Sequence, residues 1–99
     1  MLAVISLALL LSTYSLAASG AETYKARCSA CHGAKGVGET MIGRNLKLRS
    51  LASPEVQKLS DDELFVIIGK GKSKMPRFDN KLSHDQIRDL VKHIRALKK

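Results

Sequence analysis

Two cysteines and a histidine stand together in the stretch CSACH, at residues 28–32, and no other feature limits the fold of this chain as strongly. The chain has 99 residues and no further cysteine. So short a chain buries little apolar surface and usually depends on disulfides, a metal or a large cofactor for its stability. A disulfide across a two-residue gap closes a tiny loop and adds little. The stretch therefore points to something larger than a disulfide.

The N-terminus has the features of a targeting segment. No charged residue precedes Glu22, and residues 2–18 are mostly apolar and end in small residues. These are features of a secretory signal, although the start carries no Lys or Arg. An uncleaved anchor on the outer face of the inner membrane is the alternative, because the apolar run is near the lower length limit for a span. We expect residues 1–20 to be a signal peptide or anchor, and residues 21–99 to form one periplasmic or otherwise exported domain.

The remaining sequence predicts an all-α domain of three or four short helices. No segment after the leader alternates apolar and polar residues as a strand does. Three features mark where helices should begin: the Ser-Pro pair at 53–54 and the capping boxes Ser60–Glu63 and Ser83–Gln86. Helices are expected over residues 21–31, 53–59, 60–71 and 83–99.

Loops are expected over residues 39–52, which show no clear period, and over 72–82, around Met75 and Pro76. Apolar residues recur at helical spacing in the last two helices, so these two helices should supply most of the core. The residues expected to be buried are Leu64, Phe65, Ile67, Ile68, Ile87, Leu90, Val91, Ile94 and Leu97.

Four interpretations of CSACH compete. A redox dithiol uses the same cysteine spacing, but it normally lies at a strand-to-helix junction, and no strand is predicted. A structural zinc site needs four ligands, and outside CSACH only His84 and His93 are left to complete it. A plain disulfide leaves His32 without a role.

The fourth interpretation is covalent attachment of a c-type haem, for which C-x-x-C-H is the signature. The spacing suits this chemistry, because Cys28 and Cys31 would lie along one porphyrin edge and add to its two vinyl groups. His32 would then give its imidazole to the iron. A covalently held haem would also supply the core that so short a chain lacks.

Beyond the motif, the sequence resembles the small monohaem c-type cytochromes of class I over residues 20–99. CSACHG matches the haem attachment motif, and GKSKMPRF resembles the family's Met-Pro segment. Tyr24 and Gly20 match an aromatic and a small residue that pack against the C-terminal helix in the family. The resemblance implies a cytochrome c-like helical bundle around one haem, and a one-electron carrier rather than an enzyme.

The resemblance also implies that Met75 is the sixth iron ligand. A methionine is usually core filler, but Met75 stands in a loop among charged and polar residues. Met41 is the alternative ligand, while His84 and His93 are expected at the surface. Cofactor-binding residues are then Cys28, Cys31, His32 and Met75, with His32 and Met75 on the iron. The aromatic residues expected to line or brace the haem are Tyr24, Phe65 and Phe78, within an apolar wall that includes Leu64 and Ile68.

The charge of the chain indicates an acidic partner. The formal net charge is +8, and cations crowd the segment around Met75, where Asp79 is the single acid between residues 64 and 81. Such a ring of cations would steer docking to acidic redox proteins, although a solvated surface is the simpler explanation. An exported monomer gives no reason to expect nucleic acid. The cations are Lys70, Lys72, Lys74, Arg77 and Lys81, with Lys35 from the attachment side.

Two alternatives to the electron carrier stay open at this point. One keeps the haem but makes the protein responsive to gas or peroxide, with Met75 labile or absent from the iron. The other has no haem and uses Cys28 and Cys31 as a thiol–disulfide couple. The sequence shows no paired carboxylates, no nucleophile with a base and no phosphate loop that would indicate catalysis by side chains.

Overall fold

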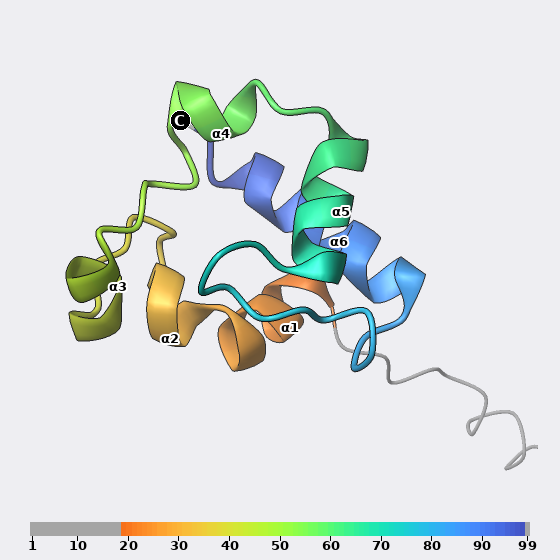
Figure 1. Ribbon diagram of the computed structural model, residues 1–99. Coiled ribbons are helices and arrows are strands. Elements are labelled where there is room, and N and C mark those ends of the chain that lie inside the picture. Colours follow the sequence, from red (N-terminus) through yellow and green to blue (C-terminus); the bar gives the residue numbers. More distant parts are fainter. Residues whose placement is uncertain (1–18, 99) are drawn as a thin grey trace, which may run out of the picture.

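In the computed structural model, which describes residues 19–98, six helices follow one another with no strand between them (Figure 1). The all-α prediction is confirmed. Across these residues no helix combines the length and the apolar character needed to cross a membrane. The expected leader lies outside the described residues apart from its last two positions. The helices are α1 (Gly20–Arg27), α2 (Ser29–His32), α3 (Met41–Leu46), α4 (Pro54–Gln57), α5 (Asp61–Lys70) and α6 (His84–Ala96).

Side-chain caps fix where most of these helices begin. The predicted capping boxes at Ser60 and Ser83 are both formed, and Ser53 caps α4 as expected. A further capping box at Ser19 starts α1, so two residues that we had assigned to the leader belong to the folded body. Each cap satisfies backbone N–H groups that would otherwise lack a partner at a helix start.

The predicted helix over residues 21–31 is divided at Cys28. The Cys28 backbone has φ −117° and separates α1 from α2. The hydrogen-bonding pattern nearly continues, because the Cys28 N–H donates to the Tyr24 carbonyl (2.8 Å) and the His32 N–H donates to the Cys28 carbonyl (2.9 Å). The break therefore changes the path of the chain without exposing its polar groups.

We predicted a loop over residues 39–52, but the helix α3 lies within this segment. Thr40 Oγ1 accepts a hydrogen bond from the Gly43 N–H (2.9 Å) and donates to the Cys31 carbonyl (2.9 Å). A Cβ on Gly43 would come within 2.5 Å of the Cys31 carbonyl oxygen, so α3 lies directly on the backbone of α2. So short and exposed a helix shows no apolar periodicity in the sequence. The signal that the sequence does contain is Thr40, a residue type that often precedes the first turn of a helix.

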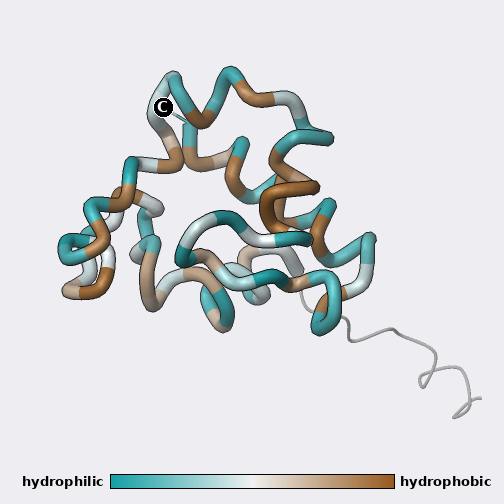
Figure 2. Tube along the Cα trace, in the orientation of Figure 1, coloured by the Kyte–Doolittle hydropathy of each residue, from teal (hydrophilic) through white to brown (hydrophobic). Residues whose placement is uncertain are grey.

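The core lies where α6 packs against α1 and α5, and Figure 2 shows the apolar stretches of these helices. Ile87 and Leu90 are almost completely buried. Phe65, Ile67 and Leu97, which we expected in the core, are only partly buried. The buried apolar residues are Tyr24, Leu64, Ile68, Phe78, Leu82, Ile87, Leu90, Val91 and Ile94.

Arg95, near the end of α6, ties the segment around α4 to the rest of the domain. Its guanidinium donates to the Asp61 carboxylate (2.9 Å), to the Gln57 carbonyl (3.0 Å) and to the Leu59 carbonyl. The Gln57 side chain donates in turn to the Leu51 carbonyl (2.8 Å). These bonds fix the 51–59 segment, whose single four-residue helix is too short to be stable alone.

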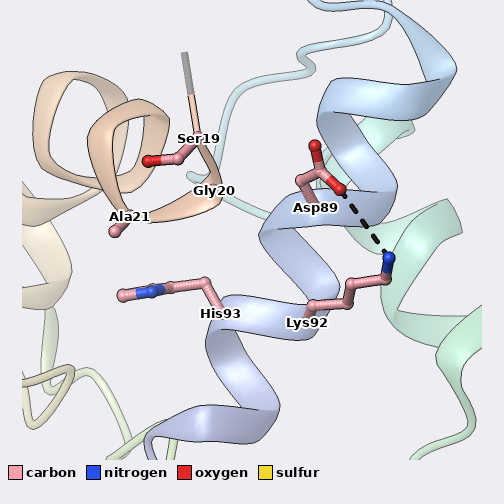
Figure 3. A pocket seen from close by; sticks show the side chains of 6 residues that line it. All are labelled: Ser19, Gly20, Ala21, Asp89, Lys92 and His93. Atoms are coloured by element: carbon pink, nitrogen blue, oxygen red, sulfur yellow. Dashed lines mark ion pairs between the residues drawn. The ribbon is translucent and has the colours of Figure 1, made fainter.

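α1 approaches the backbone of α6 closely at Gly20 (Figure 3). A Cβ on Gly20 would overlap the carbonyl oxygen of Asp89, which belongs to helix backbone and cannot rotate away. The side chains of Asp89 and Lys92 lie beside this contact, with 4.0 Å between carboxylate and ammonium. The resemblance had implied this close packing of Gly20 and Tyr24 against the last helix.

We therefore predict that Gly20→Ala lowers the free energy of unfolding by about 1–3 kcal/mol, the usual cost of overpacking. Denaturant unfolding of the mature protein measures this loss. Gly69→Ala is the matched control, because its nearest neighbours, Asp79 Cβ and Ile87 Cδ1, would be 3.7 and 3.9 Å away. Equal stability of the two variants would contradict the close contact at Gly20.

Candidate functional site

A cavity of about 710 Å³ lies between α2, the segment after α3 and the loop after α5. Cys28, Cys31 and His32 line it from one side, and Met75 lines it from the loop. The structure thus brings together all four site residues predicted from the sequence. The volume is in the range of sites that hold a large ligand.

The apolar wall of the cavity differs from the predicted one. Of the wall residues expected, only Phe78 lines the cavity, while Leu64 and Ile68 lie in the core. On α5 the side chain that faces the cavity is Ile67. Ile67 and Ile68 lie on different faces of α5, because the side chains of consecutive residues in an α-helix point about 100° apart. Two leucines that the sequence did not reveal complete the apolar wall: Leu46, the last residue of α3, and Leu48, two residues further on.

Phe65, which we expected to line or brace the cofactor, is not among the residues that line the cavity. Its ring lies edge-on to His84, with 5.5 Å between the ring centroids, and the Arg88 guanidinium lies 4.7 Å from its centroid. Phe65 is two residues from Ile67, which places it on the opposite side of α5. It packs at the edge of the core, and His84 is exposed as predicted.

Tyr24 braces the end of α2 rather than lining the cavity. Its hydroxyl donates a 2.7 Å hydrogen bond to the carbonyl of Gly33, the residue after His32. Its ring lies against His93 with 4.6 Å between centroids, so His93 is half-buried instead of lying freely at the surface. Burial raises the pKa of Tyr24 to about 12, and the hydroxyl keeps its proton.

His32 lines the cavity with an imidazole that is half-buried. Its Nδ1 atom is buried and has no hydrogen-bond partner among the described residues. Burial lowers the pKa of His32, which favours the neutral imidazole that binds metals. A buried nitrogen without a hydrogen bond is costly, and this atom is the one side-chain nitrogen or oxygen among the described residues that the structure gives as buried and unsatisfied.

The cysteines do not resemble a redox couple. Both are free thiols, and burial raises the pKa of Cys28 to about 11, so this thiol stays protonated near neutral pH. Reactive dithiols have lowered pKa values instead. Within residues 19–98 no three His, Cys, Asp or Glu side chains are placed so that they could hold one metal ion.

The loop that carries Met75 is tightly wound. The Lys72 N–H donates to the Met75 carbonyl (3.1 Å), and the Met75 N–H donates to the Lys72 carbonyl (2.9 Å). Ser73 between them has φ 56°, a left-handed conformation that glycine adopts more readily. A Cβ on Gly71 would lie 2.6 Å from the Met75 carbonyl oxygen. These contacts hold half-buried Met75 at the cavity, whereas Met41 lies outside it and is 76% exposed.

Cations surround the cavity from three sides. Of the cations expected near Met75, Lys72 and Lys74 line it, while Arg77 is paired with Asp79 at 2.7 Å. Three further cations line the cavity and were not predicted: Arg27, Lys47 and Arg49. Asn45 and Ser73 are the polar neutral residues of this lining.

Comparison with known proteins agrees with this site. The family described as cytochrome c oxidase, cbb3-type, subunit III, matches residues 15–94. The chain belongs to the class I monohaem c-type cytochromes. This cytochrome therefore carries a covalently attached haem c and serves in electron transport.

Relatives and solved structures cover most of the cytochrome. Cytochrome c6 of Leptolyngbya boryana is 32% identical over 78 residues, which are 79% of this chain and 88% of the relative. Cytochrome c6 of a Synechococcus strain is 30% identical over 96 residues, 94% of this chain and 83% of the relative. The KustC0563 c-type cytochrome superposes with a TM-score of 0.76 at 33% identity, covering 83% of this chain and all of that one. Cytochrome c6 from the diatom Phaeodactylum tricornutum superposes with a TM-score of 0.58 at 26% identity, covering 78% and 87%.

The residues of the cavity fit a haem c. Two cysteines stand three residues apart at one wall, and His32, whose pKa is lowered by burial, follows directly. Apolar side chains and cations surround the remaining space, as an apolar macrocycle with two carboxylates requires. The fold thus places the two cysteines and the histidine of the attachment motif together at one cavity.

Tyr24→Phe should lower the free energy of unfolding by about 1–3 kcal/mol, because the buried Gly33 carbonyl loses its donor. The substitution leaves the ring against His93 in place. The raised pKa also predicts a difference at high pH. Stability from the neutral hydroxyl is complete below the ordinary pKa of 10.0 and is lost as the pH rises through about 12.

Denaturant unfolding across this pH range checks both effects. The difference in the free energy of unfolding between the wild-type cytochrome and Tyr24→Phe should disappear between about pH 10 and 12. A constant difference between the two proteins up to pH 12 would show that the hydroxyl is not protected in the folded state.

Proposed function

We propose that this cytochrome carries single electrons, with His32 and Met75 as the axial ligands of the iron. Cys28 and Cys31 form the two thioether bonds in this proposal. The observation that carries it is the meeting of both cysteines, the histidine and Met75 at one cavity. Met75 lies in a loop, is half-buried at the cavity and at the edge of the core, and has its backbone fixed by the hydrogen bonds to Lys72.

When bound, haem c supplies a one-electron couple between ferric and ferrous iron. The thioether of Met75 and the imidazole of His32 would occupy both axial positions, and histidine–methionine ligation raises the potential. Ile67, Phe78, Leu46 and Leu48 would surround the bound haem with apolar side chains, and an apolar surrounding disfavours extra charge at the iron. With both positions filled, these residues support electron exchange rather than binding of gas or peroxide.

Replacing Met75 tests this ligation. We expect Met75→Leu to open the sixth position, so that the reduced protein gains a large spectral change on adding carbon monoxide. The matched control is Met41→Leu, which removes a thioether that is 76% exposed and outside the cavity. The wild-type protein and the control should show a low-spin spectrum that carbon monoxide leaves unchanged.

A strong carbon monoxide response of the wild-type protein would instead support the gas- or peroxide-responsive alternative. A purified protein without covalent haem, matured in a host that attaches haem, would contradict the attachment sites themselves.

We also propose that the protein is exported and that the leader is removed before Ser19. Two observations support this position for the cut: Ser19 forms the capping box of α1, and Gly20 packs on the backbone of Asp89. Small residues at Ala17 and Ala18 provide the cleavage site.

The intact mass of the protein purified from an exporting host checks this proposal. We expect a mass that corresponds to a chain beginning at Ala18 or Ser19. If the mass instead corresponds to a chain that begins at Ala21, the role of the Ser19 cap is contradicted. If the mass corresponds to a chain that still includes the leader, the leader is an anchor.

The partners are proposed to be acidic redox proteins. The ring of cations around Met75, of which Lys72 and Lys74 line the cavity, supports this assignment. Charge steering of this kind weakens as salt is added, so affinity for an acidic partner should fall with ionic strength.

A further inference from the structure

His93, on α6, is half-buried although the haem site does not use it. Its ring lies against the buried ring of Tyr24, with 4.6 Å between the ring centroids. His84, by contrast, is exposed at the start of the same helix. An imidazole changes its charge between about pH 5 and 8, which an aliphatic or phenyl side chain at this contact would not do. The contact between the first and last helices therefore includes a group that gains and loses a proton.

A surface hollow of about 400 Å³ gives the His93 imidazole access to solvent. Figure 3 shows His93 reaching from α6 toward Ala21, while the Asp89 carboxylate is turned toward Lys92. Asp89 and Lys92 form a loose pair, with 4.0 Å between carboxylate and ammonium. Among the residues that the structure describes, no carboxylate lies within ion-pair distance of His93. A proton on His93 thus adds a charge that no paired acid cancels.

The other charged groups around this contact keep their charge when His93 titrates. Carboxylates, lysines and arginines ordinarily hold one charge state between about pH 5 and 8. Tyr24 stays neutral there, because burial raises its pKa to about 12. The charged residues of the elements packed around His93 are Glu22, Lys25 and Arg27 on α1, Lys35 and Glu39 after α2, and Asp89, Lys92, Arg95 and Lys98 in the last turns of the chain.

Tyr24 joins His93 to the haem attachment motif. Its hydroxyl donates a buried hydrogen bond of 2.7 Å to the carbonyl of Gly33, which directly follows His32. One aromatic ring and one hydrogen bond thus separate His93 from the neighbour of the proposed iron ligand. Tyr24 is only 3% exposed, and charges interact more strongly across buried groups than across water.

We propose that His93 controls how the reduction potential of the haem depends on pH, because a proton bound to His93 disfavours the ferric state. The proposal rests on the proposed function as a one-electron carrier and adds to it a residue outside the cavity. The iron takes one electron from the reduced partner and loses one positive charge, so a cation at His93 is repelled less in the ferrous protein. A fraction of a proton is therefore taken up from water onto His93 with each electron, and it is released when the electron is passed on.

The effects of the proton and of the electron on each other must be equal in size. A twofold higher proton affinity of His93 in the ferrous protein corresponds to about 18 mV, because a tenfold change corresponds to about 59 mV for one electron. We expect an effect of at least about this size, which two independent measurements on the same protein must reproduce.

Redox titration of the purified, haem-loaded cytochrome between about pH 5 and 8 is the first measurement. The wild-type potential should fall with rising pH by at least about 18 mV more than that of His93→Phe, which keeps a ring against Tyr24 but binds no proton. The matched control is His84→Phe, which removes an exposed imidazole from the same helix and should follow the wild-type profile. The carboxylates of the haem are common to the three proteins, so their titration cancels in the comparison.

Proton NMR of the imidazole rings in the wild-type protein is the second measurement, and it requires no variant to fold. The His93 ring protons should titrate at a higher pH in the ferrous protein than in the ferric protein, by at least about the twofold ratio in proton affinity. The His84 ring protons should titrate at nearly the same pH in both oxidation states.

Different outcomes overturn different claims. If the wild-type cytochrome exchanges one electron reversibly but His93 titrates at the same pH in both oxidation states, the role of His93 is wrong and the carrier function stands. The same conclusion follows if His93 does not titrate in this range, or if His84→Phe loses as much pH dependence as His93→Phe. If the haem-loaded protein shows no reversible one-electron couple, the proposed function itself fails.

Discussion

The hydrogen bond from Tyr24 to the Gly33 carbonyl joins the core of this molecule to its cavity. On the core side, Tyr24 packs among the buried residues of α1 and α6. On the cavity side, Gly33 ends the short helix that carries Cys31 and His32. A four-residue helix has no stability of its own, so the geometry of the attachment motif depends on this anchor and on α3.

The cavity is built from pieces that have little structure in isolation. The wall after α3 and the loop of Met75 contain the two non-glycine residues with left-handed backbones in the described chain, Lys47 and Ser73. Both line the same cavity. Residues in such conformations persist where surrounding contacts determine them, and they concentrate at ligand sites. Their position on two facing segments agrees with a cavity shaped for a bound group.

The sequence predicted the parts of the structure that leave a local signal. Capping boxes at Ser60 and Ser83 marked helix starts, and the attachment motif with Met75 marked four residues that line one cavity. It could not separate the two faces of α5, because Phe65 and Ile67 are equally apolar and only the packing of α6 decides between them. The position of α3, and with it the cations Lys47 and Arg49, also depends on packing against α2, and the Thr40 cap marks only where α3 begins.

The pairing of the first and last helices has a consequence for when this domain can form. α1 finds its partner only after the chain has been synthesised through α6, and Arg95 fixes the 51–59 segment only at that point. Contacts between distant parts of a chain are formed late and slowly in folding. The thiols of Cys28 and Cys31 therefore emerge long before the structure that would enclose them. During that interval the attachment motif is an extended, accessible peptide, which gives an attaching machinery time to act before the cavity closes.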